Sequence, residues 1–472
     1  KCKSTQRNVL SMDYIENLQF EQLSLPFGEE SPKQEYLLIP SSLQGFHNTD
    51  TTSHFLPSGR KSFCMNGTLD VPEERSCPSC GSRMHVNQRF QKTLKHLPVG
   101  NGISCIKFEH VQYLCPDCGR THMQEIPFQS EHHRITKELE EYVRVLLGLH
   151  TFTNKEISEL SGVGQNIVKA IDKQRLEGLY IEDGKLRHPS EQTRFLGIDE
   201  FKLHNGHKYA THIINMANGH ILWIAEGKKK QVVYDFIEHV GLEWMSHVEA
   251  VALDMNSDFQ EAFEEKCPHL RMVFDYFHIV KNFNDKVVGE IRKDEQKRLI
   301  AEGDLEAAKL LKHSKYIVTS SRETLARKDR EAKEGRVLRK KGKVFSVSEV
   351  KRKDIGYLER YESILQKNRL LFTADLIKEL LREAYASRNE SRMQELITKV
   401  LDLCVNSGNE HMAWFWRLLV RHFDGIISHA VYHISAGKIE GINNKIKTLR
   451  RQAYGYPDDE YFFLKLIDMS RH

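Results

Sequence analysis

The chain has 472 residues, 40% hydrophobic and 28% charged, a composition that predicts a water-soluble protein of about three domains. No run approaches the roughly 18 apolar residues of a membrane span, which excludes a membrane protein, and a net charge of +4 indicates little about partners. The first residues lack a signal core and the nine cysteines are an odd number, so we expect a cytoplasmic protein whose cysteines bind metal rather than form a disulfide framework.

Residues 1–72 are rich in Ser, Gln, Asn, Thr and Pro and have only weak hydrophobic periodicity. Such a composition provides little apolar surface to bury. We expect a poorly ordered N-terminal extension or a small adaptor, without an assignable function.

Two copies of one cysteine pattern follow, in a segment that we delimit as residues 73–130. They are Cys77-Pro-Ser-Cys80-Gly81 and Cys115-Pro-Asp-Cys118-Gly119. Each Cys-x-x-Cys turn brings two thiolates to one ion, and two such turns complete a tetrahedral four-thiolate site. The pattern predicts a zinc ribbon with a structural Zn²⁺, and we expect the nearby His85, His110 and His122 to be surface or packing residues.

Residues 131–190 have the pattern of a helix-turn-helix. Thr153 and Glu156 form a capping box, and Gly162 marks a turn between two short amphipathic helices. The expected inner faces consist of Ile157, Leu160, Val163, Ile167, Val168 and Ile171. The second helix then presents outward four polar side chains that we expect to contact DNA: Gln165, Asn166, Lys169 and Lys173.

Residues 191–295 alternate strand and helix. Strands are expected at 194–198, 209–216, 220–225, 248–253 and 272–274, with helices beginning near residues 231, 257 and 278. Two apolar strands each end in a carboxylate, Asp199 and Asp254, which neighbouring strands can bring close together. Such a pair repels itself without a cation and suits a hard divalent ion. For Glu200, Asp258 and Asp275 we expect helix capping instead.

Residues 296–432 are almost entirely helical by period. Residues 281–353 hold 22 Lys/Arg against 12 Asp/Glu, and this excess includes an acid-free run with Lys340 and Lys341. A basic segment of this kind can neutralise phosphates. We expect a helical region that contacts DNA, and we expect Trp414 and Trp416 to pack in its core.

A last helix is expected from about Ser435, within the segment 433–472. Its apolar stripe consists of Ile439, Ile442, Ile446 and Leu449, while another face carries Glu440, Asn444, Lys447 and Arg451. A carboxylate beside an amide and two cations suits a metal next to a nucleic-acid backbone, although a solvated charged face would also explain the cations. Glu440 is the one acid among five bases in residues 438–451.

These motifs together resemble a bacterial insertion-sequence transposase of the ISL-three family. The resemblance runs from about Ser76 to the end of the chain and rests on three segments. They are the paired Cys-Pro-x-Cys-Gly motifs before a helix-turn-helix; Gly197-Ile-Asp199-Glu200 with Asp254-Met-Asn256 and Asp275-Tyr-Phe-His278-Ile-Val-Lys281; and Ile439-Glu440-Gly-Ile-Asn443-Asn444-Lys-Ile-Lys447. The last segment is the most specific.

The resemblance implies a multidomain α/β protein with an RNase H-like core that a helical insertion interrupts between Asp254 and Glu440. It implies a DDE triad of Asp199, Asp254 and Glu440 that holds two Mg²⁺ ions, for which Mn²⁺ substitutes, with His278 as a further contact to the scissile phosphate. His278 also fits a capping or packing role.

The implied partners are the terminal inverted repeats of an element and target DNA, bound by a homodimer at the nucleoid. A nuclease or resolvase on the same fold, and a DNA-binding regulator without catalysis, are the alternatives.

Overall fold

The computed structural model describes residues 43–71, 75–204, 206–334, 356–435, 437–452 and 457–472. The chain forms two compact units, Lys1–Glu140 and Glu141–His472, with the boundary inside helix α1 (Lys137–Gly148). Both helices and sheets occur, as expected for a multidomain α/β protein. Within the described ranges, no helix is both long and apolar enough to span a bilayer.

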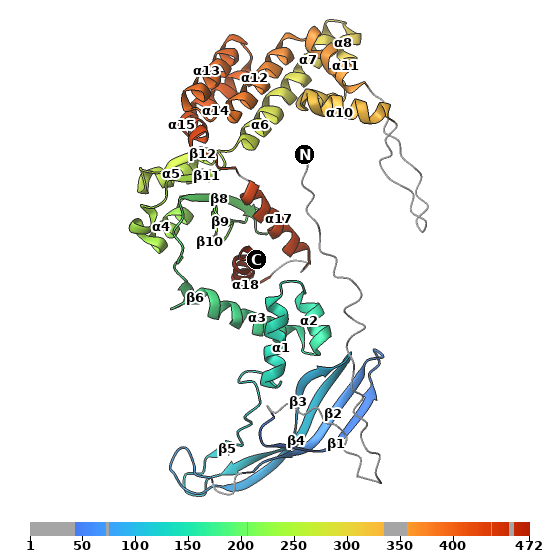
Figure 1. Cartoon of the computed structure of the whole chain (residues 1–472), viewed down its shortest axis with the longest axis vertical. Helices are drawn as coiled ribbons and strands as arrows, with labels where there is room; N and C mark the ends of the chain where they lie inside the picture. The colour runs from blue at the N-terminus through green and yellow to red at the C-terminus, as the bar shows by residue number, and fades with distance from the viewer. Residues whose placement is uncertain (1–42, 72–74, 205, 335–355, 436, 453–456) are drawn as a thin grey trace, which may run out of the picture. The chain divides into compact units, whose positions relative to one another are not determined.

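The first unit is built on a five-stranded sheet (Figure 1). The strand order is β1-β2-β4-β3, and β5 pairs with β4. The long β3 and β4 form an antiparallel hairpin, whereas β2 and β4 run parallel. Aromatic and aliphatic side chains fill one face, among them Phe46, Leu94, Phe108 and Phe128. The strands are β1 (Phe46–Phe55), β2 (Lys61–Leu69), β3 (His85–Val99), β4 (Gly102–Leu114) and β5 (Thr121–Met123).

Strands β1 and β2 correct the expectation for residues 1–72. Strands within residues 46–69 belong to the sheet, and residues 1–42 and residue 72 of that segment fall outside the described ranges. The sequence of β1, Phe-His-Asn-Thr-Asp-Thr-Thr-Ser-His-Phe, is almost wholly polar, and Phe46 is its one buried residue. A strand that buries a single side chain does not show the alternation by which strands are identified.

The second unit contains a mixed five-stranded sheet in the order β10-β9-β8-β11-β12. Strands β8, β11 and β12 run parallel, while β9 and β10 are antiparallel additions. The expected alternation of strands and helices is confirmed. Its elements are β8 (Phe195–Lys202), β9 (Tyr209–Asn215), β10 (Ile221–Glu226), α4 (Lys230–Met245), β11 (Ala250–Leu253), α5 (Ser257–Lys266), β12 (Arg271–Phe274) and α6 (Tyr276–Phe283).

Two hydrophobic cores cover the two faces of this sheet. Helices α4 and α5 supply Phe236 and Phe263 to one core. Helices α17 (Gly437–Gln452) and α18 (Asp459–Ser470) supply Ile439 and Phe462 to the other. Helix α17 begins near the expected position, whereas α18 was not anticipated as a separate helix. The sheet therefore lies between a pair of helices from its own crossovers and a pair from the C-terminus (Figure 1).

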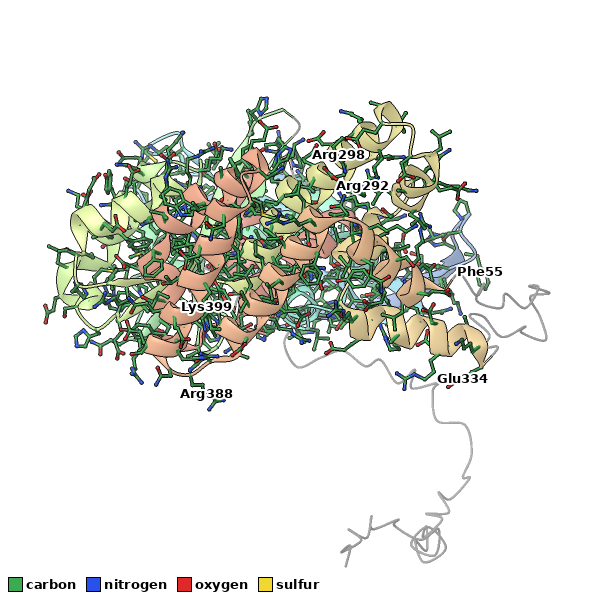
Figure 2. The ribbon with its side chains drawn as sticks, turned by 90° about the horizontal axis from the view of Figure 1, so that it is seen from above. Phe55, Arg292, Arg298, Glu334, Arg388 and Lys399 are labelled. Carbon is green, nitrogen blue, oxygen red and sulfur yellow. The ribbon has the colours of Figure 1, made fainter. Side chains whose placement is uncertain are left out.

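The expected helical region is confirmed for the described residues between α6 and α17. Helix α6 continues through a π-helical turn at Asn284–Val288 into α7, so one helical path leads from the sheet into this region. Figure 2 looks onto these helices, and the labelled side chain of Arg388 points away from them. They are α7 (Gly289–Ala301), α8 (Leu305–Leu311), α9 (Lys315–Thr319), α10 (Arg322–Lys333), α11 (Tyr357–Lys367), α12 (Arg369–Ala386), α13 (Glu390–Asn406), α14 (Glu410–Arg421), α15 (Phe423–Ile427) and α16 (His429–Tyr432).

Two short helices, α2 (Asn154–Ser161) and α3 (Gln165–Tyr180), precede the small hairpin of β6 (Ile181–Glu182) and β7 (Lys185–Leu186). Thr153 and Glu156 form the expected capping box, and Gly162 ends α2 in the left-handed conformation, at φ +73°. The apolar side chains meet between the helices as expected, except that Leu160 is 42% exposed.

Candidate active site and metal centre

The four cysteines of the two motifs come together at one end of the β3–β4 hairpin. Their sulfur atoms all lie within 4.8 Å of one another. The Sγ atoms of Cys77 and Cys118 are 3.6 Å apart, and those of Cys80 and Cys115 are 3.4 Å apart. A tetrahedral ion with Zn–S bonds of about 2.3 Å requires sulfur atoms about 3.8 Å apart. The cluster therefore fits a zinc ion with little adjustment.

The local backbone explains why the motif contains glycine after each pair. Gly81 and Gly119 adopt positive φ angles of +80° and +69°, and each donates its N–H to the carbonyl of the first cysteine of its motif. Hydrogen bonds from Ser82, first from its backbone N–H and then from its side chain, together with those to the neighbouring thiols, lower the pKa of the Cys80 thiol to about 6. This favours the thiolate, which is the form that binds metal.

Asp199 and Asp254 lie on adjacent strands. In the parallel pairing of β8 and β11, Ile198 is opposite Leu253, so the next residue on each strand is a carboxylate. Asp254 immediately follows β11, as expected, whereas Asp199 lies inside β8, which continues to Lys202. The difference arises because β9 remains paired with β8 beyond Asp199.

The pKa values of the two carboxyl groups are shifted in opposite directions. Burial raises the pKa of Asp199, and the negative charge of Asp254 adds to that effect. Burial also disfavours the Asp254 carboxylate, but the hydrogen bond and positive charge of His278 outweigh it and lower the pKa of Asp254. The His278 Nδ1 atom lies 3.3 Å from Asp254 Oδ2. His278 thus contacts the predicted active-site carboxylate directly, from the first turns of α6.

A glycine on β8 allows helix α17 to approach the same strand. A Cβ atom at Gly197 would lie 2.5 Å from the Met216 sulfur and 2.9 Å from Ile439 Cδ1. Asp199, two residues later, points to the same face. There its Oδ2 atom accepts a hydrogen bond of 2.7 Å from the side-chain amide of Asn443. The close approach at Gly197 and this hydrogen bond fix α17 against the strand that carries Asp199.

Glu440 lies one helical turn before Asn443 and is exposed. Three groups of possible metal ligands have their atoms within 4.8 Å of one another among the described residues, and Asp199, Asp254 and Glu440 are not one of them. The fold therefore places two of the expected ligands on neighbouring strands and the third on the helix that packs over them. The three carboxylates do not lie within 4.8 Å of one another.

Glu200 and Asn256 also lie in this region, although the sequence analysis assigned neither of them to the site. Burial raises the pKa of Glu200, followed by the negative charge of Asp199, and a hydrogen bond with Asn256 opposes both. Glu200 lies within β8 and caps no helix. Asn256, rather than Asp258, caps α5 with its side chain. Asp275 occupies the expected N-cap position of α6, but its side chain makes no capping hydrogen bond.

The polar side chains of α3 differ in their surroundings. Gln165 and Asn166 are exposed, as expected for residues that reach DNA. Lys169 and Lys173 instead lie 2.9 Å and 3.6 Å from Asp458, the N-cap residue of α18. The expectation that both lysines point outward is therefore corrected in part, because α18 packs along this side of α3 and leaves their side chains 38% and 31% exposed; their contact with DNA stays a prediction.

Two buried aspartates fasten α3 to α18. Asp172 of α3 accepts a hydrogen bond from the Tyr461 hydroxyl and lies 2.9 Å from the Lys465 ammonium. Asp468 of α18 accepts 2.7 Å hydrogen bonds from Arg175 and from the Tyr180 hydroxyl. We refer to these contacts as the α3–α18 clamp. Since α18 also packs on the sheet, the clamp connects the second helix of the expected DNA-binding pair to the carboxylate-bearing core.

The other residues expected from the sequence lie on α17 and in the helical region. Asn444, Lys447 and Arg451 are exposed on α17, on the side expected for them. Trp414 and Trp416 pack against the hydrophobic core, as expected. Lys340 and Lys341 lie outside the described residues, and so does most of the basic excess: residues 281–334 hold 14 Lys/Arg against 11 Asp/Glu.

Comparison with known proteins agrees with this arrangement. A family model described as "Transposase", for the ISL-three group of DDE transposases, matches residues 196–466. The transposase for insertion sequence element IS1001 of Bordetella parapertussis is 24% identical over 392 residues, which cover 83% of this chain and 87% of that protein. The transposase for IS1557 of Mycobacterium tuberculosis is 23% identical over 416 residues, covering 84% and 86%. The chain therefore belongs to the ISL-three family of DDE transposases.

Proposed function

We propose that this transposase binds the ends of an insertion sequence, cleaves DNA there and joins the freed 3′-OH to target DNA, with Asp199, Asp254 and Glu440 as its catalytic carboxylates. The observation that carries the proposal is the juxtaposition of Asp199 and Asp254 on β8 and β11 beneath a helix that Asn443 holds to Asp199. The sheet order, with two antiparallel strands beside three parallel ones, supports an RNase H-like core.

The donor set fits Mg²⁺ or Mn²⁺. Both ions prefer carboxylate oxygens, and two adjacent carboxylates repel each other until a cation lies between them. When bound, divalent ions activate the attacking oxygen and stabilise the leaving oxygen in phosphodiester cleavage and transfer. The raised pKa of Asp199 is consistent with a site in which a cation is needed to balance the charge.

Glu440 is the third ligand of the proposed set. Its carboxylate starts one turn from Asn443, on a helix fixed by Gly197 and Ile439. Lys447 and Arg451 follow on the same exposed side and are suited to the DNA backbone. His278 holds Asp254 through its Nδ1 atom. Its role at the scissile phosphate, expected from the resemblance, is then secondary to orienting that carboxylate.

DNA recognition is assigned to the cysteine cluster and to helices α2 and α3. On α3, the exposed Gln165 and Asn166 are the side chains for base edges, at the N-terminal end that enters the major groove in helix-turn-helix proteins. Lys169 and Lys173 contribute to docking on α18, and their contact with DNA stays a prediction. Two copies of the chain, one for each element end, form the proposed assembly.

The decisive experiment is incubation of the full chain with labelled element ends, target DNA and Mg²⁺, followed by mapping of nicks and joints. Asp199→Asn, Asp254→Asn and Glu440→Gln should each reduce both products by several orders of magnitude, while binding to the ends is retained. Asp258→Asn is the matched control because Asp258 pairs with Lys229 at 3.0 Å, outside the carboxylate pair. Nicks without joints would identify a nuclease instead, and normal joining by Glu440→Gln would exclude Glu440 from the triad.

A further inference from the structure

A cavity of about 670 Å³ in the first unit is lined by an unusual set of cations. Its walls come from Phe90 to Thr93 of β3, His110 of β4, the segment 123–131 that begins at the end of β5, and the first residue of α1. Three basic side chains line it: Lys92, Arg134 and Lys137. All of these residues belong to the first unit, and none was among the DNA contacts expected from the sequence.

Across the described ranges, no acid is paired with any of the three cations. Among the described residues, Lys92, Arg134 and Lys137 make no side-chain hydrogen bond or ion pair, although Glu125 and Glu131 line the same cavity. Elsewhere in the same sheet, Arg89 does pair with Glu109 at 2.6 Å. Cations left free in a shared recess, with acids in reach, indicate a place for an anion that comes from outside.

The electrostatics of Lys92 agree with this interpretation. Burial lowers the pKa of Lys92, and the positive charge of Arg134 lowers it further. Two like charges in a partly buried recess disfavour each other, and a bound anion would remove that cost. Phosphate oxygens are the preferred partners of an Arg and Lys combination, since guanidinium donates two parallel hydrogen bonds and ammonium acts as a point charge.

We propose that this cavity binds a phosphodiester group of double-stranded DNA through Lys92, Arg134 and Lys137. The proposal rests on the function proposed above. The surroundings favour DNA over a small free anion, because the opening has apolar side chains suited to sugars: Phe90 is 42% exposed and Met123 is 49% exposed. Along β3, the seven residues from His85 to Gln91 are all exposed, and five of them are polar or charged.

The test measures binding of the full chain to a labelled duplex of arbitrary sequence as a function of salt. A phosphate contact contributes about −0.9 to the slope of log K against log salt. Lys92→Gln and Arg134→Gln should each weaken binding for every sequence and make the slope shallower by about 1. Lys107→Gln is the matched control because Lys107 is exposed on neighbouring β4 and does not line the cavity.

A further variant distinguishes the loss of a phosphate contact from misfolding as the cause of weaker binding. Glu125→Gln removes an acid from the same cavity and should tighten binding, an outcome that damage to the fold does not produce. Titration with inorganic phosphate, followed by calorimetry, separates the two sources of a phosphate group. Slopes for Lys92→Gln and Arg134→Gln that match Lys107→Gln would overturn the proposal, whether or not phosphate binds alone.

The proposal that the cavity binds DNA and the proposed function can fail independently, and the two failures give different results. If the wild-type chain neither nicks nor joins DNA but the slopes change as expected, the cavity still binds the DNA backbone and only the catalytic proposal fails. If joining proceeds and the slopes stay unchanged, the catalytic proposal stands and the cavity has no role in binding DNA.

Discussion

Replacing Asp468 by Asn tests whether the α3–α18 clamp stabilises the second unit. Asp468 is only 2% exposed and accepts hydrogen bonds from Arg175 and Tyr180. Asparagine has nearly the same shape and keeps one acceptor oxygen, so the change removes the charge and little packing. Arg175, itself only 13% exposed, then loses one of its two carboxylate partners.

The expected loss of stability depends on the partners that Arg175 and Tyr180 keep in the variant. Breaking a buried ion pair by removing one partner costs about 3–5 kcal/mol, since the other charge is left uncompensated. Here Arg175 keeps Asp172 at 3.0 Å, and Tyr180 keeps an acceptor. We therefore expect the free energy of unfolding to fall by about 2–3 kcal/mol at pH 7. Asp402→Asn, at an exposed position on α13, should change it by less than about 0.5 kcal/mol.

The pH dependence gives an independent check. Burial alone would raise the pKa of Asp468, but hydrogen bonds from Arg175 and Tyr180 lower it below its ordinary value. A depressed carboxyl pKa stabilises the folded state above the unfolded pKa of about 3.9, and this stabilisation is lost as the pH falls through the folded pKa. The difference between wild type and Asp468→Asn should thus be present at neutral pH and shrink below about pH 4.

Urea unfolding followed by tryptophan fluorescence is the suitable assay. The four tryptophans, Trp223, Trp244, Trp414 and Trp416, all lie in the second unit, so the signal reports on that unit alone. An Asp468→Asn variant as stable as Asp402→Asn at pH 7 would show that the clamp does not stabilise the unit.

Three further outcomes are expected. Cys80→Ser should lose the one zinc expected per chain by elemental analysis and unfold the β3–β4 end of the first unit, because so small a cluster depends on its metal; full zinc content in this variant would contradict the four-thiolate site. Gly197→Ala should cost about 1–3 kcal/mol by overpacking and should slow joining, since its Cβ would displace α17 at Ile439; Gly178→Ala, where a Cβ meets nothing within 4 Å, is the control. Asn443→Ala should reduce joining while leaving DNA binding unchanged, and equal joining rates would exclude Asn443 as a positioning residue.

Much of the second unit follows from local pattern. The apolar run of β8 precedes Asp199, β11 ends just before Asp254, and α17 has an apolar stripe of Ile439, Ile442 and Ile446, all of which are buried. These signals are contained within each element, so the sequence alone predicts which elements carry Asp199, Asp254 and Glu440, although β8 continues past Asp199 because β9 remains paired with it. The cysteine cluster is equally local, because each Cys-x-x-Cys turn prepares its own half of the site.

What the sequence could not predict depends on contacts between distant elements. Lys169 and Lys173 have the pattern of outward-facing DNA contacts until Asp458, almost 300 residues later, is placed beside them. Asp172 and Asp468 resemble ordinary surface acids on their helices, and only the packing of α3 on α18 buries both. The polar strand β1 likewise gains its place from pairing with β2 rather than from its own hydrophobicity.

The clamp connects the proposed DNA-binding helix α3 to the core that carries the proposed catalytic carboxylates. If a helix-turn-helix were joined to the core by a free linker, DNA binding would not affect the core. In this structure, α3 is instead held by buried ion pairs to α18, which packs on the carboxylate-bearing sheet. Buried charged contacts of this kind are intolerant of small displacements, because each charge must keep its partner. If Gln165 and Asn166 bind an element end as proposed, the clamp would fix the position of that end relative to Asp199 and Asp254 and would supply the rigidity that an in-line displacement at phosphorus requires.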